Sequence, residues 1–438
     1  MRTGAEVRTA TRWAAQHGIA RVVVGRAAKR GDLQARLVAD GGRTDPYPLH
    51  AELRARGHLV AGAISAVTAS HGVTAEVLRS NDFGVQRDLR DVPGPVRAAL
   101  RWSSRGAPLH PLEQPSLLAV DDPEHRRYRR LVSSVFTARA VARMAEEVQG
   151  VADRLLDDLA TAGPTSRVDL VERYASRLPL EVIAEMLGVG AHDHALVLRL
   201  GTQIAASLDV GVPFTEFRTV SAGLREFDTW IGTHLQHLRT HPGDDLLSQL
   251  VAGGQDGEQL TEQELRSTAG LLLAAGFETT VNLLGSGIRL LQEHPDQLER
   301  LRADPSWWPT AVDELLRLES PVQVTSRSAL RDTEVTGLPV AAGTRIVMFL
   351  GGANRDPEVF PDPDTLDVTR ANAGQHVAFA GGRHFCLGAA LARMEGEIGL
   401  RTLLQRFPHL TLLDGAQRQP TRVLRGWRTL PATLGPSS

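Results

Sequence analysis

The sequence contains a single cysteine, Cys386, among 438 residues, and only 5% of its residues are aromatic. One cysteine excludes an internal disulfide and agrees with a reducing compartment. So few aromatic residues argue against the stacking surfaces that bind single-stranded nucleic acid. Lys29 is the only lysine, and the formal net charge is −2. The molecule as a whole is therefore no electrostatic match for nucleic acid or for an anionic membrane.

Long hydrophobic runs are also missing. No stretch approaches the roughly 20 consecutive apolar residues that a membrane-spanning helix needs. The chain begins Met1-Arg2-Thr3 without an apolar segment followed by a small-residue cleavage site. With 42% hydrophobic and 23% charged residues, its composition is that of an ordinary globular protein. We therefore expect a cytoplasmic protein with no membrane span.

The chain divides at about residue 40. Residues 1–40 form a basic extension around Trp13, which we predict to be helical. We favour an amphipathic helix that packs on the body, and attachment to a membrane surface is the alternative. Residues 41–438 contain no internal repeat and no low-complexity linker, so we predict that they form one domain.

Helical periodicity dominates the pattern along the chain. Apolar residues recur at three- and four-residue spacing over 123–136, 138–159, 178–187 and 214–239. The strongest helix is predicted from Thr261, which starts a capping box with Glu264, to His294, which precedes a proline. Strands are predicted between 322 and 348, and a last long helix over 387–407. The predicted fold class is mainly α with a smaller β portion.

The most informative segment is Phe379-Ala380-Gly381-Gly382-Arg383-His384-Phe385-Cys386-Leu387-Gly388. Its cysteine lies where a loop ends and a helix begins, so free N–H groups and the helix dipole should favour a thiolate. Thiolate is the form of cysteine that binds metal. We interpret the two adjacent glycines as letting the backbone pass close to a flat ligand. Without this context, a lone cysteine is usually a small buried hydrophobic residue.

With Ala389-Ala390-Leu391-Ala392-Arg393 after it, this segment resembles the haem-binding signature of cytochromes P-450. Ala380 stands where a small polar residue or glycine is more usual. The resemblance implies haem b (iron protoporphyrin IX) between the long central helix and the cysteine-loop helix, with Cys386 as the iron ligand. It also implies haem contacts for Phe379, Gly388 and Ala275. Because it extends from about residue 45 to 434, we expect 41–438 to be a single, monomeric P-450 catalytic domain.

The predicted central helix carries an acid and an alcohol among leucines. Gly276 costs about 1 kcal/mol relative to alanine, and an unpartnered Glu278 is unfavourable in an apolar stretch. We interpret this as a functional kink; a glycine packing contact beside a solvent-facing glutamate is the alternative. Ala275-Gly276-Phe277-Glu278-Thr279 resembles the oxygen-activation motif of the family. The resemblance implies that Thr279 hydrogen-bonds dioxygen and that Glu278 supplies protons through water, and we count Gly276 with them in the catalytic set.

An ion pair is predicted below the haem. Glu314 and Arg317 lie three apart, where helical side chains can meet, and their spacing matches the family's Glu-x-x-Arg, a buried structural pair. The family adds an arginine-phenylalanine pair downstream, where this chain has Thr365-Leu366. Arg370 is a candidate replacement for the third member of the network.

Two propionates require several cations on one rim of the haem. His125 and Arg129 are four apart on one predicted helix, Arg327 lies in the β segment, and His384 precedes the cysteine by two residues. The resemblance implies that these four residues contact the propionates. Each of them alone would be read as an ordinary solvated side chain.

The electrons must come from another protein. The chain has no Gly-x-Gly-x-x-Gly fingerprint that opens a helix after a strand. The resemblance therefore implies a ferredoxin with its ferredoxin reductase. Arg126, Arg127 and Arg130 are predicted to offer an acidic partner a basic patch. A merely solvated face is the alternative.

The resemblance implies a haem-thiolate monooxygenase that inserts one oxygen atom from O2 into an apolar small molecule by hydroxylation or epoxidation. Polyketide, macrolide and terpenoid tailoring in secondary metabolism are the favoured settings, and a steroid or a fatty acid is an alternative substrate. The substrate pocket is expected between the loop before the His125 helix and the 195–225 region. One alternative is a non-catalytic haem sensor or carrier, which would not need Glu278 and Thr279. Another is a cysteine hydrolase, which would need an acid or amide to orient His384.

Overall fold

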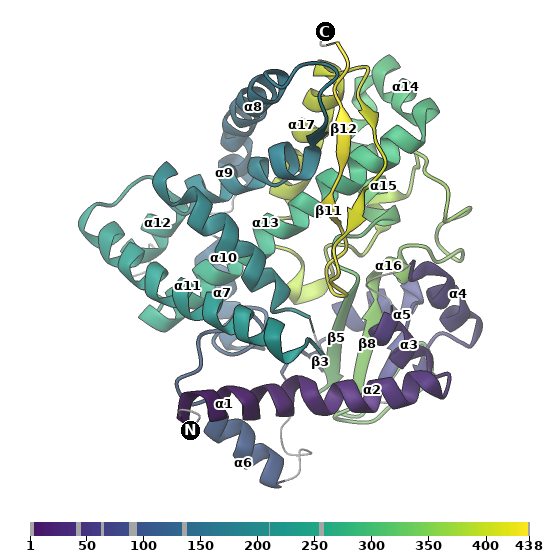
Figure 1. The fold of residues 1–438 in the computed structure, drawn as a ribbon. Helices are drawn as coiled ribbons and strands as arrows, with labels where there is room; N and C mark the ends of the chain where they lie inside the picture. The colour runs from purple at the N-terminus through teal and green to yellow at the C-terminus, as the bar shows by residue number, and fades with distance from the viewer. Residues whose placement is uncertain are drawn as a thin grey trace.

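The computed structural model describes residues 4–40, 45–62, 65–86, 94–133, 138–209, 211–253 and 258–436. Helices make up most of this part of the chain (Figure 1). The α-helices are α1 Gly4–Trp13, α2 Ile19–Lys29, α3 Leu33–Asp40, α4 Tyr47–Ala55, α5 His71–Arg79, α6 Gly94–Ser103, α7 Glu124–Ser133, α8 Ala138–Ala160, α9 Arg177–Met186, α10 His194–Ala206, α11 Phe214–Thr240, α12 Leu246–Ala252, α13 Glu262–Glu293, α14 Pro295–Ala303, α15 Trp308–Leu318, α16 Leu350–Ala353 and α17 Ala389–Arg406.

The helix α13 runs through the middle of the helical part (Figure 1). Its capping box is confirmed: Thr261 Oγ1 accepts from the Glu264 N–H, and Glu264 Oε2 accepts from the Thr261 N–H at 2.8 Å. The helix ends at Glu293, and the next residue, His294, is its C-cap. Among the described residues, α13 is the one helix long and apolar enough to cross a membrane, yet 78% of its most apolar window is buried. It is therefore the core helix of the protein.

The neighbouring helices complete the core around α13. It packs against α10, α17 and α9, and leucines from all four contribute to one large hydrophobic cluster. The predicted helices over 178–187, 214–239 and 387–407 appear as α9, α11 and α17 with ends shifted by one or two residues. The predicted helix over 123–136 is seen as α7, and residues 134–137 lie outside the described residues.

The β portion is small and lies beside the helices. The strands are β1 Val60–Ala61, β2 Ala66–Thr68, β3 Phe83–Gly84, β4 Val168–Asp169, β5 Val324–Ala329, β6 Thr333–Val335, β7 Leu338–Val340, β8 Arg345–Phe349, β9 Thr411–Leu412, β10 Gln417–Arg418, β11 Trp427–Thr429 and β12 Pro431–Thr433. The largest sheet has the order β1-β2-β8-β5-β3 and is antiparallel except where β2 pairs with β8. The predicted class, mainly α with a smaller β portion, is confirmed.

The helices α1 and α2 are joined by a π-helical turn, Ala14–Gly18, and extend along one edge of the molecule (Figure 1). They are fastened to the residues that precede α11. Trp13 Nε1 donates to the Val212 carbonyl at 2.9 Å, and Arg21 donates to the Gly211 carbonyl at 2.6 Å. The Gly211 N–H in turn donates to His17 Nδ1 at 3.0 Å. The N-terminal helices therefore bind the α10–α11 connection directly.

A buried ion network joins α15 to the irregular segment that precedes the cysteine loop. Arg317 donates to both carboxylate oxygens of Glu314 at 2.6 and 2.8 Å, and both side chains are fully buried. Arg370 Nε donates to Glu314 at 3.0 Å, so Arg370 is the third member of the network. Thr365 contributes only its carbonyl, which accepts from both arginines.

Replacement of Glu314 by alanine should leave two buried guanidinium groups without a counter-charge. We expect Glu314→Ala to lower the free energy of unfolding by about 3–5 kcal/mol, as for other broken buried pairs. Glu299→Ala is a matched control, because Glu299 and Arg302 form the same i,i+3 pair at the surface. Its cost should stay below about 1 kcal/mol. Urea unfolding of both variants measures the difference, and equal costs would contradict the structural role of Glu314.

Candidate active site

The cysteine loop is held in shape by its own backbone. The Cys386 N–H donates to the Phe379 carbonyl at 3.0 Å, and the Phe385 N–H donates to the Gly382 carbonyl at 3.1 Å. Ala380 adopts the left-handed conformation with φ 58°, which explains why glycine would also suit that position. The loop therefore returns on itself and delivers Cys386 to the start of α17.

The two adjacent glycines of this loop lie against α5. Gly382 has φ 63°, and a Cβ there would lie 2.1 Å from the Leu78 carbonyl oxygen. A Cβ on Gly381 would meet Leu78 as well, at 3.4 Å. Both positions therefore allow the loop to pass close to the end of α5. Gly388, by contrast, faces open space.

The Cys386 thiol lies in a mixed environment. Burial raises its pKa, and this effect outweighs the Gly388 N–H and the positive charges of Arg129 and Arg393, which lower it. The predicted effect of the backbone N–H groups is thus present, but burial has the larger effect on the pKa of Cys386. The residue is nevertheless accessible to solvent. A bound metal ion would supply the charge that favours the thiolate.

Two histidines meet beside the cysteine loop. His125 on α7 and His384 have ring centroids 4.1 Å apart, and each has a buried Nε2 without a hydrogen-bond partner among the described residues. Burial lowers the pKa of His125 to about 4 and also lowers that of His384. Asp121 lies 3.9 Å from His384 Nε2 and accepts from the backbone of Val85 and Gln86. The Nε2 atom of each ring can therefore form a hydrogen bond with a ligand.

Two arginines lie in the same region. Arg129 donates to the Phe385 carbonyl at 2.7 Å, next to the cysteine. Arg327 on β5 is only 7% exposed and donates to Thr325 Oγ1 and the Ser326 carbonyl. No carboxylate in the described part of the chain forms an ion pair with it, and burial lowers its pKa to about 10. A buried guanidinium without an anion is costly and marks a site for a negatively charged ligand.

The acid and the alcohol of α13 differ in their exposure to solvent. Glu278 is 7% exposed, so the alternative of a solvent-facing glutamate is wrong. Burial raises the pKa of Glu278 to about 7. Thr279 Oγ1 donates to the Ala275 carbonyl at 2.6 Å, and Ala275 is exposed in the middle of this otherwise buried helix. The helix is α-helical throughout 262–293, so the expected kink is not a break in its hydrogen bonding.

A second buried acid was not found from the sequence. Glu395 on α17 is 3% exposed and forms a hydrogen bond with the Thr280 side chain of α13. Burial raises its pKa to about 8. Only its place on the buried face of α17 distinguishes it from the surface glutamates nearby. Asp121 was also missed, because its role depends on a contact with a residue more than 260 positions away.

The predicted basic patch on α7 is largely neutralised. Arg126 forms an ion pair with Asp122 at 3.0 Å, and Arg127 and Arg130 pair with Glu264 and Glu258. Each of the three arginines in the predicted patch therefore has a carboxylate partner.

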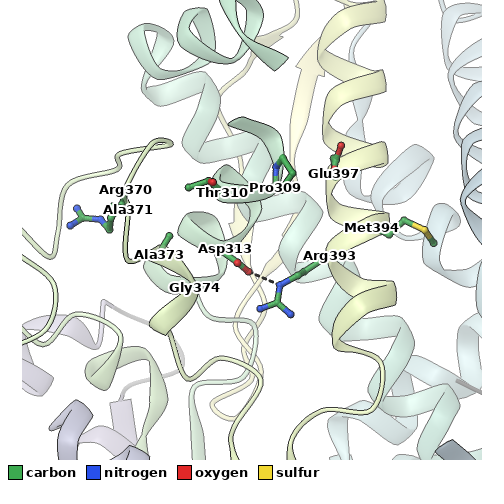
Figure 2. A pocket seen from close by; sticks show the side chains of 10 residues that line it. All are labelled: Pro309, Thr310, Asp313, Arg370, Ala371, Ala373, Gly374, Arg393, Met394 and Glu397. Atoms are coloured by element: carbon green, nitrogen blue, oxygen red, sulfur yellow. Dashed lines mark hydrogen bonds and ion pairs between the residues drawn. The ribbon is translucent and has the colours of Figure 1, made fainter. Parts of the chain in front are cut away.

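A cleft of about 460 Å³ lies between α15, the turn at Ala373–Gln375 and α17 (Figure 2). Asp313 and Arg393 face one another across it, and Arg393 Nε donates to Asp313 at 2.7 Å. The Arg393 guanidinium also lies 4.6 Å from the centre of the Phe379 ring. This contact ties the cysteine loop to α15.

These residues fit a haem. The two orphaned imidazole nitrogens and the unpaired Arg327 match a group with two carboxylates, and the accessible sulfur matches an iron ligand. Phe379, Gly388 and Ala275 are compatible with a flat apolar ring, since the first is buried beside the loop and the other two border open space or solvent.

Comparison with known proteins gives matches over nearly the whole chain. The cytochrome P450 family model matches residues 309–426. Cytochrome P450 140 of Mycobacterium tuberculosis (strain ATCC 25618 / H37Rv) is 51% identical over 429 residues, 97% of either chain. The 6-deoxyerythronolide B hydroxylase of Saccharopolyspora erythraea is 41% identical over 318 residues, 72% of this chain and 76% of that protein. The crystal structure of P450BioI with a fatty-acid-ligated acyl carrier protein has a TM-score of 0.79 at 30% identity, covering 89% of this chain and 98% of that one.

The raised pKa of Glu278 predicts a specific pH dependence of stability. Between its usual pKa of 4.5 and about 7 the carboxyl is protonated when folded and ionised when unfolded, so stability falls as the pH rises. Glu278→Gln removes this loss. We expect the variant to gain about 2–3 kcal/mol relative to the native protein between pH 5 and pH 8.

Chemical denaturation at the two pH values measures this gain. The exposed Glu172→Gln is the control and should show no comparable gain. A pH-independent difference between Glu278→Gln and the native protein would show that Glu278 is ionised in the folded state.

Proposed function

The chain belongs to the cytochrome P450 family, and from this premise we propose that it inserts one oxygen atom from O2 into an apolar small molecule of secondary metabolism, by hydroxylation or epoxidation. As a cytochrome P450 monooxygenase it uses haem b with a cysteine thiolate ligand. When bound, the haem supplies the activation of O2. The protein side chains then decide where the haem lies, which protons reach the oxygen, and which substrate is held above it.

We assign the thiolate to Cys386. The chain has one cysteine, so this is the only residue that can supply the sulfur ligand of the family. His125, His384, Arg129 and Arg327 are assigned to the propionates for three reasons. Each imidazole has an unused Nε2, Arg129 bonds to the cysteine loop at Phe385, and burial lowers the pKa of Arg327. Phe379, Gly388 and Ala275 are assigned to the porphyrin faces and edge.

The observation that carries the proposal is the buried Glu278 next to Thr279 in the central helix. A carboxyl group with a pKa of about 7 can take up and release a proton near neutral pH, which suits a general acid. Thr279 is partly accessible and offers a hydroxyl that can orient a proton donor or water at the oxygen. The Thr280 hydroxyl, one turn later, donates a hydrogen bond to the Gly276 carbonyl at 3.1 Å. A sensor or carrier of haem has no use for such a proton path.

The names of the relatives support the proposed substrate class, and the sequence motifs support the proposed electron-transfer partners. The names of two relatives, 6-deoxyerythronolide B hydroxylase and the polyketide biosynthesis cytochrome P450 PksS, support hydroxylation and polyketide tailoring here as well. We propose that a ferredoxin and its reductase deliver the electrons, since the sequence has no nucleotide-binding fingerprint of its own. We further propose that the protein is a cytoplasmic monomer.

Turnover tests the proposal directly. The purified protein, supplied with ferredoxin, ferredoxin reductase and NAD(P)H, should convert an apolar ligand that shifts the haem from low to high spin. If no ligand that shifts the spin state is converted to product, the result would instead support a sensor.

Replacement of Cys386 by serine should remove the sulfur ligand and keep a side chain of similar size. We expect Cys386→Ser to lose the red-shifted Soret band of the reduced, carbon-monoxide-bound protein and to retain less haem. Met394→Leu removes another sulfur nearby, on α17, and should leave the spectrum unchanged. The assignment is wrong if Cys386→Ser keeps the thiolate spectrum.

Replacement of Thr279 by alanine should uncouple electron use from product formation. Because a positioned proton donor contributes roughly 10²–10⁴-fold, we expect the product formed per NAD(P)H to fall about tenfold or more. Thr279→Ser keeps the hydroxyl and should retain most of the coupling. Unchanged coupling in Thr279→Ala would exclude the proposed role, whatever the rate of NAD(P)H use.

A further inference from the structure

A second cleft lies far along the chain from the cysteine loop, between α1, the end of α6 and the first turns of α11. It has a volume of about 410 Å³. Its lining is formed by Glu6, Arg8, Thr9, Arg12, Ser103, Arg105, Gly106, Ala107, Phe214, Phe217, Arg218, Ser221, Ala222 and Arg225. None of these residues is assigned to the haem. Two walls of the cleft belong to the segments expected to border the substrate pocket, the one before α7 and residues 195–225, but α1 adds a third wall that the expected pocket lacks.

The cleft is strongly positive. Five arginines line it, and Glu6 is the only acid among the lining residues. Within the described residues, Arg8, Arg105 and Arg218 form no ion pair, and the guanidinium of Arg225 bonds only to the Ser221 carbonyl at 3.5 Å. Five like charges beside one lining carboxylate repel one another, so this arrangement is unfavourable unless an anion binds.

Arg12 provides an independent sign of a missing partner. It is 5% exposed, yet it pairs only with the half-exposed Glu113 at 3.4 Å. Its buried Nε has no hydrogen-bond partner among the described residues. Burial of a guanidinium with an unused donor is costly, and such costs are retained where a ligand completes the site. The positive field also contributes to the low pKa of the neighbouring His17, after burial itself.

The charge is local and does not follow from the composition of the chain. Residues 1–40 contain eight basic and three acidic residues, a net charge of +5. The whole chain has a net charge of −2, so residues 41–438 carry −7. The N-terminal extension therefore brings positive charge to an otherwise acidic protein, and α1 places part of it against α11.

We propose that this cleft binds a phosphate-bearing molecule. Guanidinium groups bind phosphate oxygens in pairs of parallel hydrogen bonds, and a group with two or more negative charges is needed to balance several of them. A single carboxylate would neutralise only one. Phe214 and Phe217 give one wall an apolar character, so the ligand joins its phosphate to an apolar portion. The volume suits a small molecule.

The phosphate can belong to a soluble metabolite or to the headgroup of a phospholipid, and the two sources share this chemistry. Exposed apolar side chains on the same N-terminal helices, Val7, Ile19, Val22 and Val23, would suit the second source. The experiment therefore includes one arm for each source.

The first arm is isothermal titration of the haem-loaded protein with pyrophosphate. We expect saturable binding of one pyrophosphate per chain, weakened by added salt. Arg218→Ala and Arg105→Ala should each weaken it on the order of tenfold. Arg239→Ala is the matched control, because Arg239 lies on α11 as well but pairs with Glu262 away from the cleft. It should leave the affinity unchanged.

The second arm is sedimentation with phosphatidylglycerol vesicles, with phosphatidylcholine vesicles as reference. Binding of pyrophosphate alone assigns a soluble ligand, and binding of anionic vesicles that the same two substitutions weaken assigns the lipid headgroup. The proposal is overturned if the native protein binds neither probe, or if Arg218→Ala and Arg105→Ala bind like Arg239→Ala. The reduced carbon-monoxide spectrum of every variant should stay native, so these outcomes are separate from those that test the monooxygenase.

Discussion

The carboxylate of Glu314 is the point on which the cysteine side of the molecule depends. It accepts from Arg317 and Arg370 and from the Asp367 N–H at 3.1 Å, all in a buried setting. These bonds hold a stretch with little regular structure against α15. Asn354 continues the connection, because its side chain accepts from the Val377 N–H at 2.7 Å, two residues before Phe379. The position of Cys386 is thus set by polar contacts of a segment that does no chemistry.

Features with a local signal could be predicted from the sequence. The capping box at Thr261 and the helix end at His294 depend on spacing within one segment. Arg370 is indicated by its place just after Thr365-Leu366, where the family has its arginine-phenylalanine pair. The mainly α fold followed from the helical periodicity, and the family from the cysteine segment. In each case the residues that carry the signal are neighbours along the chain.

Features decided by contacts between distant segments could not be predicted. Gly382 is needed because α5 passes behind the loop, and the pKa of Cys386 is raised because burial outweighs the helix start. Arg127 and Arg130 of α7 pair with Glu264 and Glu258, which follow more than 120 residues later. Glu395 looks like a surface residue until α17 is packed against α13. Charge and burial at a site are properties of the assembled core, which a linear pattern does not contain.

The bonds from Trp13, His17 and Arg21 to residues 211 and 212 have a mechanical consequence. The connection between α10 and α11 cannot swing outward as a free hinge, because it would drag two helices with it or lose three hydrogen bonds at once. Its movement is therefore coupled to the N-terminal segment. A chain of this family without such a segment would lack these three hydrogen bonds. The N-terminal helices therefore restrain the movement of the α10–α11 connection.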